Sequence, residues 1–150
     1  MKSLNRKAAP AAILAALLAG GALAQAGAPL PPVHNSGPVE YLSGGIGADE
    51  SAAIQSASRQ WPLALEFAIK DRQRADFAAD VKVRIRDARG NEVLQATSEG
   101  PFLLARLAPG SYAVEATLAG QTQHRKVDVK AGQSSRQMFL WGAETDKNRS

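Results

Sequence analysis

The sequence contains no cysteine among its 150 residues, which excludes several kinds of chemistry. The chain can form no disulfide, zinc–thiolate site or iron–sulfur cluster, and it has no thiol nucleophile. Histidine is almost as scarce, since His34 and His124 are the only two and lie far apart in the sequence. Catalytic zinc sites need sets of His and Glu or Asp ligands. We therefore expect no metal, no other cofactor and no enzymatic activity.

A surplus of one charge is also missing once the N-terminus is set aside. The whole chain has a formal net charge of +4, but Lys2, Arg6 and Lys7 lie in a segment that we expect to be removed. Without these three, 15 Lys and Arg remain against 14 Asp and Glu, a net charge of +1. Nucleic-acid-binding domains usually carry a clear basic surplus. The near-neutral remainder therefore argues against a nucleic-acid partner.

Residues 1–26 have the three zones of a secretory signal peptide. The positive residues just named precede an apolar run from Ala11 to Ala24 that is short for a membrane span. Small residues allow cleavage after Ala24 or after Ala26. No cysteine follows, so the chain cannot be a lipoprotein. The pattern predicts export to a bacterial periplasm, with no transmembrane segment after the signal peptide is removed.

The next segment is rich first in proline and then in glycine. Prolines at four positions in residues 27–43 favour an extended linker: Pro29, Pro31, Pro32 and Pro38. Glycines then lead to Asp49 and Glu50, and helical spacing continues to about Gln60, where Pro62 ends the helix. We expect one short helix here, opened by a tight glycine turn that lets it pack closely. A phosphate site is disfavoured because the two carboxylates would repel an anion.

Alternating apolar and polar residues dominate the rest of the chain. In residues 81–86, two valines and an isoleucine alternate with Lys82, Arg84 and Arg86, which gives one apolar and one charged face. Seven such strands are expected, near residues 63–70, 81–86, 93–97, 102–107, 112–118, 122–130 and 137–141. No helical pattern separates them, so the sheets should be antiparallel, in a sandwich or barrel. The predicted domain covers residues 44–142, and residues 143–150 form a polar tail.

Two segments within residues 81–141 match a family pattern. Residues 107–114 read LAPGSYAV, similar to a strand entry L-x-P-G-x-Y-x-V, and residues 127–132 read VDVKAG, similar to a closing V-x-V-x-x-G. With these segments the chain resembles the carboxypeptidase regulatory-like domain, a transthyretin-like β-sandwich related to CnaB-type domains. The resemblance implies a mainly β, seven-stranded antiparallel Greek-key β-sandwich (prealbumin-like) with one short N-terminal α-helix. It implies an accessory domain rather than a catalytic one.

Two surface features are candidates for partner contact. Lys82, Arg84 and Arg86 could bind anionic polymers of the cell envelope, although Asp80, Asp87 and Glu92 nearby favour an ordinary solvated face. Trp141 comes last in its strand and is the aromatic residue that we expect to be partly exposed. The partner would be an envelope protein or glycan. The sequence predicts neither its identity nor the oligomeric state.

Three hypotheses about function follow. The first is a non-catalytic exported module that binds or supports another envelope component. The second is a small-molecule hydrolase, because transthyretin-like hydroxyisourate hydrolases use a His/Arg site. Those enzymes end in Tyr-Arg-Gly-Ser, whereas this chain ends in residues 146–150, DKNRS. The hydrolase would require His124 in a cleft with Arg or Asp partners. The third is a purely structural or stress-related periplasmic protein.

Overall fold

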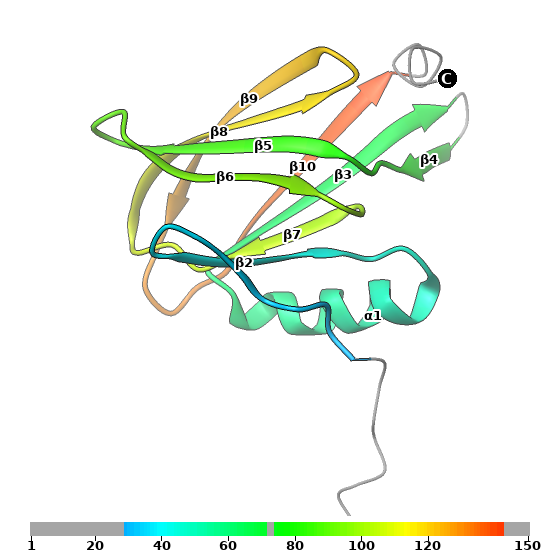
Figure 1. Cartoon of the computed structure of the whole chain (residues 1–150), viewed down its shortest axis with the longest axis horizontal. Helices are drawn as coiled ribbons and strands as arrows, with labels where there is room; N and C mark the ends of the chain where they lie inside the picture. The colour runs from blue at the N-terminus through cyan, green and yellow to red at the C-terminus, as the bar shows by residue number, and fades with distance from the viewer. Residues whose placement is uncertain (1–28, 72–73, 143–150) are drawn as a thin grey trace, which may run out of the picture.

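The computed structural model describes residues 29–71 and 74–142, so the predicted signal peptide and polar tail lie outside the described residues. Its elements form two sheets and one helix (Figure 1). Sheet A contains β1 (His34–Ser36), β2 (Val39–Gly44), β3 (Leu63–Asp71), β4 (Arg74–Phe77), β7 (Phe102–Ala105) and β10 (Ser135–Gly142). Sheet B contains β5 (Val81–Asp87), β6 (Glu92–Ser98), β8 (Gly110–Leu118) and β9 (Gln121–Val129). The helix α1 (Ala48–Ala57) continues into the 3-10 turn η2 (Ser58–Gln60).

The two sheets have different strand orders and one unexpected pairing. Sheet A runs β1-β2-β7-β3-β10, with β4 beside β3, and sheet B runs β6-β5-β8-β9. All pairs are antiparallel except β3 and β10, which pair in parallel from Ser135 opposite Leu63 to Gly142 opposite Lys70. The prediction of purely antiparallel sheets is therefore wrong at this pair. A parallel pair needs a long connection, and the six intervening strands provide it without a crossover helix.

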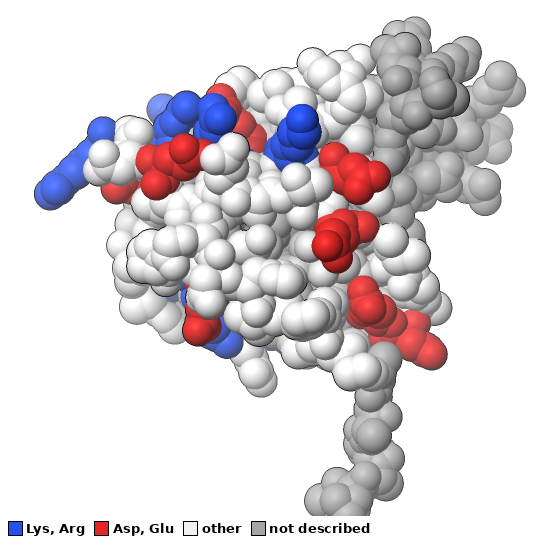
Figure 2. Space-filling model, viewed as in Figure 1, with Lys and Arg blue, Asp and Glu red and all other residues white. Residues whose placement is uncertain are grey.

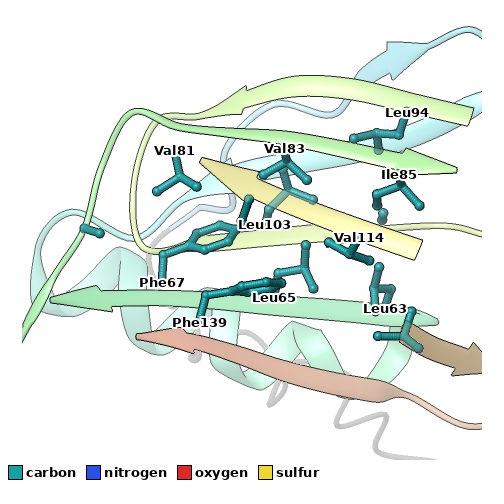
Figure 3. Packing of buried hydrophobic residues seen from close by; sticks show 14 of the residues in the cluster. Leu63, Leu65, Phe67, Val81, Val83, Ile85, Leu94, Leu103, Val114 and Phe139 are labelled. Carbon is teal, nitrogen blue, oxygen red and sulfur yellow. The ribbon is translucent and has the colours of Figure 1, made fainter. Parts of the chain in front are cut away.

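The main core lies between the two sheets. Leu63, Leu65 and Phe67 point inward from β3 and meet Val83 and Ile85 of β5 (Figure 3). These side chains occupy alternate positions, which is the period-2 pattern that the sequence shows. Phe139 and Trp141 add an aromatic group beside Phe67, with ring centroids 5.7–6.2 Å apart. The mainly β, two-sheet prediction is confirmed.

A second, smaller core lies on the other face of sheet A. Ile54 of α1 and Trp61 after η2 are buried against Leu42, Phe102 and Leu104, which point away from sheet B. The sequence predicts the helix correctly, and Asp49 and Glu50 lie in its first turn, where carboxylates suit the helix dipole. The helix covers the outer face of sheet A, as Figure 1 shows.

The prediction of seven strands and a plain linker is wrong in three places. β1 and β2 cover most of the second half of the proposed linker 27–43 and end one residue beyond it, at Gly44; they form a hairpin whose loop is Gly37 and Pro38. Gly37 has a φ of 58°, which suits the first position of such a loop, and Pro38 needs no hydrogen-bond donor there. β4 occupies residues 74–77, between two of the predicted strands, where no strand was expected. Ten strands are therefore found in residues 29–71 and 74–142.

Side-chain hydrogen bonds join the two sheets at both of their open corners. At one corner Ser36 and Ser43 accept hydrogen bonds from the backbone N–H groups of Gln95 and Glu99, at 3.1 Å each. At the other corner the Gln123 side chain donates to the Leu140 carbonyl at 2.8 Å. These contacts satisfy backbone groups on strand edges that would otherwise be open to pairing with another chain.

Candidate functional site

The predicted cationic row lies on the outer face of sheet B, but acidic side chains accompany it. Lys82 is exposed, while Arg84 and Arg86 are half-exposed. Arg84 forms an ion pair with Glu92 at 3.2 Å, and Glu115 of the neighbouring strand lies 4.0 Å from Arg84 and 3.9 Å from Arg86. Figure 2 shows basic and acidic side chains interspersed over this part of the surface. The row is therefore largely neutralised, as the solvated-face interpretation expects.

Trp141 is buried, so the prediction of its partial exposure is wrong. Its exposed fraction is 2%, and its indole N–H donates to the Gln121 carbonyl at 3.0 Å. It shares the inward face of β10 with Phe139, because the two residues are two positions apart. Its place near the end of β10 does not expose it, since the first residues of β9, Gln121 and Gln123, are hydrogen-bonded to Trp141 and Leu140 there. The four predicted residues do not form one site.

Neither histidine lies in a catalytic arrangement of the kind that the hydrolase hypothesis requires. His124 lies on the outer face of sheet B with 68% of its side chain exposed, 3.5 Å from Glu115. His34 belongs to β1 rather than to a linker, and its ring lies 5.6 Å from that of Tyr41. Within residues 29–71 and 74–142, no group of three His, Asp or Glu side chains is arranged to hold a metal ion.

The glycine turn before α1 packs tightly, and its Gly45 N–H is already hydrogen-bonded within the chain. Gly45 has a φ of 102°, and a Cβ atom there would overlap the Phe102 ring. The Gly45 N–H donates to the Glu50 carboxylate at 2.8 Å. This donor is therefore already occupied by an acidic side chain of the helix. The arrangement agrees with the tight-turn interpretation of this segment.

A cleft that the sequence analysis missed lies at one end of the two sheets. We call it the end cleft, and its volume is about 410 Å³. It is formed where the end of η2, the β7–β8 loop and the β9–β10 turn meet, at the lower left of Figure 1. Hydrogen bonds tie two of these walls together: the Ser134 hydroxyl donates to the Ser58 carbonyl at 2.8 Å, and the Ser135 N–H donates to the Pro62 carbonyl at 2.9 Å. The cleft is thus held open by the fold itself.

The end cleft combines an apolar floor with a basic rim. Its floor is the margin of the two cores: Trp61, Pro62, Leu107, Pro109 and Val129. Its basic residues are Arg59, Arg106 and Lys130, all exposed, and no Asp or Glu is among the lining residues. Within the described part of the chain, no ion pair involves Arg59 or Lys130. A volume of this size and an apolar lining with few polar groups are typical of ligand pockets.

Arg106 is the best-positioned cation of the cleft. Its guanidinium carbon lies 4.1 Å from the centroid of the Trp61 ring, and its Nε lies 3.5 Å from the Glu40 carboxylate. Stacking on an indole holds a guanidinium in one plane and leaves its edge free to donate hydrogen bonds. Arg106 can therefore receive a carboxylate or phosphate with little reorganisation.

A second hollow, of about 470 Å³, lies beside the β5–β6 turn, but its acidic groups are already engaged. Asp87 accepts hydrogen bonds from the N–H groups of Asn91 and Arg89, which lower the pKa of its carboxyl. Asp128 accepts a hydrogen bond from the Ser111 hydroxyl at 2.7 Å. Burial, and then the Asp87 charge, raise the pKa of Tyr112, whose hydroxyl donates to the Ala108 carbonyl. This hollow is held together by its own polar groups.

The sequence carries a weak signal for the end cleft. A basic residue stands within two positions of a buried apolar residue in each wall: Arg59 before Trp61, Arg106 before Leu107, and Lys130 after Val129. The three pairs lie in different turns, so only the fold brings them together. Comparison of the sequence with protein-family models and with curated proteins gave no match.

Proposed function

We propose that this chain is a non-catalytic, exported β-sandwich module that binds another component of the cell envelope through the end cleft. The observation that carries the proposal is the preformed cleft with Arg59, Arg106 and Lys130 around an apolar floor. Loops on a rigid scaffold are the usual place for binding residues. The cleft also has the clear basic surplus that the row on sheet B lacks.

The proposed relationship to transthyretin-like sandwiches, with their Greek-key topology, is supported by where the matching segment lies. Leu107 is buried in the main core and Gly110 begins β8. The Tyr112 hydroxyl donates to the Ala108 carbonyl at 2.6 Å and so ties the loop to the strand. Each matching residue is used for a turn or for packing. The segment therefore bears on fold, and the function is proposed from the cleft alone.

Site-specific photocrosslinking in living cells tests the proposed function. A photoreactive amino acid replaces Gln133, an exposed residue of the cleft, and in a matched strain it replaces Thr97, an exposed residue on the outer face of sheet B. We expect one recurrent adduct from position 133 and none from position 97, identified by mass spectrometry. Crosslinking from neither position, or from position 97 alone, would contradict the proposal.

A further inference from the structure

The chemistry of the end cleft restricts what it can bind. We infer that its ligand is an acidic peptide segment of a partner protein, with carboxylates for the basic rim and an apolar side chain for the floor. This inference rests on the proposed function and names the class of partner. The basic rim supports the acidic character of this ligand, and the apolar floor supports its apolar side chain.

The rim selects for negative charge. Arg59 and Lys130 stand on different walls of the cleft without a carboxylate partner in the described residues, and Arg106 of the β7–β8 loop stacks on Trp61. A guanidinium held flat on a ring presents paired donors that match the two oxygens of a carboxylate. Glu40 shows this affinity within the chain, because its carboxylate already lies 3.5 Å from the Arg106 Nε. Charge complementarity therefore favours an acidic ligand.

The floor selects for an apolar side chain rather than a sugar. Sugars are bound by exposed aromatic faces together with polar side chains, but Trp61 has an exposed fraction of only 5% and carries Arg106 on its face. The remaining floor is aliphatic and consists of Pro62, Leu107, Pro109 and Val129. Burying one apolar side chain there removes its surface from water, which adds affinity without adding charge. A peptide supplies both an acidic and an apolar group within a few residues.

The walls suit a short extended peptide. The β9–β10 turn is hydrogen-bonded to η2 and to Pro62, so the cleft keeps its shape without a ligand. A preformed site avoids the entropic cost of ordering loops on binding. We therefore expect the full affinity to be present in short synthetic peptides, with no need for a folded partner.

The test measures binding of the purified chain to fluorescent twelve-residue peptides by anisotropy. The reference peptide contains alternating Glu and Leu; one comparison peptide has Gln for every Glu, and another has Gly for every Leu. We expect the reference peptide to bind and each comparison peptide to bind at least about tenfold more weakly. Equal binding of the reference and Gln peptides would overturn the inference.

Protein variants place the binding site. Arg59→Gln with Lys130→Gln should weaken binding of the reference peptide about tenfold, since both side chains are exposed and their loss leaves the cores intact. The matched control, Lys82→Gln with Arg89→Gln, removes two exposed charges from the β5–β6 region and should leave binding unchanged. An equal loss in both double variants would show non-specific attraction and overturn the inference.

The photocrosslinking experiment separates this inference from the proposed function. One outcome is that position 133 crosslinks to a glycan, and that polygalacturonate, an acidic glycan, displaces the reference peptide and binds the chain more tightly than that peptide does. In that case the proposed envelope-binding function stands and the peptide inference fails. If position 133 gives no adduct, the proposed function fails. An adduct with a protein whose crosslinked segment is acidic and apolar supports both.

Discussion

The outer faces of the two sheets differ in what lies against them, since one is covered by a helix and the other is exposed to solvent. The outer face of sheet A is apolar under α1, with Leu42, Phe102 and Leu104 buried against Ile54. The outer face of sheet B carries Arg84, Glu92 and Glu115 and is covered by nothing in the described residues. The first face derives its stability from burial, whereas the second contributes little beyond solubility. Perturbing each face in matched ways should therefore have very unequal effects.

The largest difference should come from placing one carboxylate on each face. Leu104→Glu puts a charge at a position with an exposed fraction of 0%, beneath the helix, whereas Thr97→Glu puts it on exposed β6 opposite Lys82. We expect the first to cost at least about 4 kcal/mol or to prevent folding, and the second to stay within about 0.5 kcal/mol of the parent. Urea unfolding followed by circular dichroism measures both. Similar losses would mean that α1 does not seal sheet A.

Truncating the helix contact should have the next largest effect. Ile54→Ala removes a fully buried side chain between α1 and sheet A and should cost about 2–4 kcal/mol. Ser56→Ala, on the exposed side of the same helix, serves as the control and should change the free energy of unfolding by less than about 0.5 kcal/mol. Thermal unfolding of the two variants gives the comparison. A cost for Ile54→Ala no greater than that of its control would show a loosely packed helix.

Removing the central carboxylate of the other face should matter much less. Glu115 lies within 4.0 Å of Arg84, Arg86 and His124, but these partners are 42–68% exposed. Glu115→Gln should therefore cost less than about 1 kcal/mol, because exposed ion pairs are screened by water and salt. Unfolding at low and high NaCl concentration checks this, and the difference from the parent should shrink at high salt. A large decrease in the free energy of unfolding that does not depend on salt would show that the outer face of sheet B also stabilises the fold.

The smallest effect should come from protonating Asp87 in the β5–β6 turn. Backbone N–H groups of Asn91 and Arg89 hold its pKa below the ordinary value in the folded chain. Its contribution is therefore complete above the unfolded pKa of about 3.9 and is lost as the pH falls through the lower folded pKa. NMR titration of the carboxyl measures this directly. A folded pKa above about 4 would contradict the hydrogen-bonding pattern.

The two faces also differ in how much of them could be predicted from the sequence. Alternation in residues 81–86 shows that Lys82 and Arg84 point outward, and the structure agrees. It does not show Glu115 beside them, because that residue comes from another strand. For sheet A, alternation places Phe102 and Leu104 on one side of β7, but only the structure shows that Ile54 covers that side. Local periodicity thus predicts the face of the sheet to which a side chain points, but it does not predict which distant residues that side chain contacts.

The missed features follow from the same limit. β1 and β2 could not be predicted from the sequence, because Pro29, Pro31 and Pro38 lie in or near them and proline usually opposes sheet formation. The burial of Trp141 involves the start of β9 beside the end of β10, a contact between strands of different sheets. The end cleft needs three turns from separate parts of the chain. In each case the deciding contact is distant in sequence, and no local pattern reports it.

The parallel pairing of β3 with β10 has a consequence for how the chain acquires its structure. β3 is an interior strand of sheet A, yet one of its two edges is paired only with residues 135–142, the last strand described. A chain that emerges from its N-terminus leaves that edge unpaired until nearly all of its residues are available. Because such distant contacts form slowly, completion of sheet A is a late event that needs the whole chain. A truncation before residue 135 would remove this partner of β3, together with one wall of the end cleft.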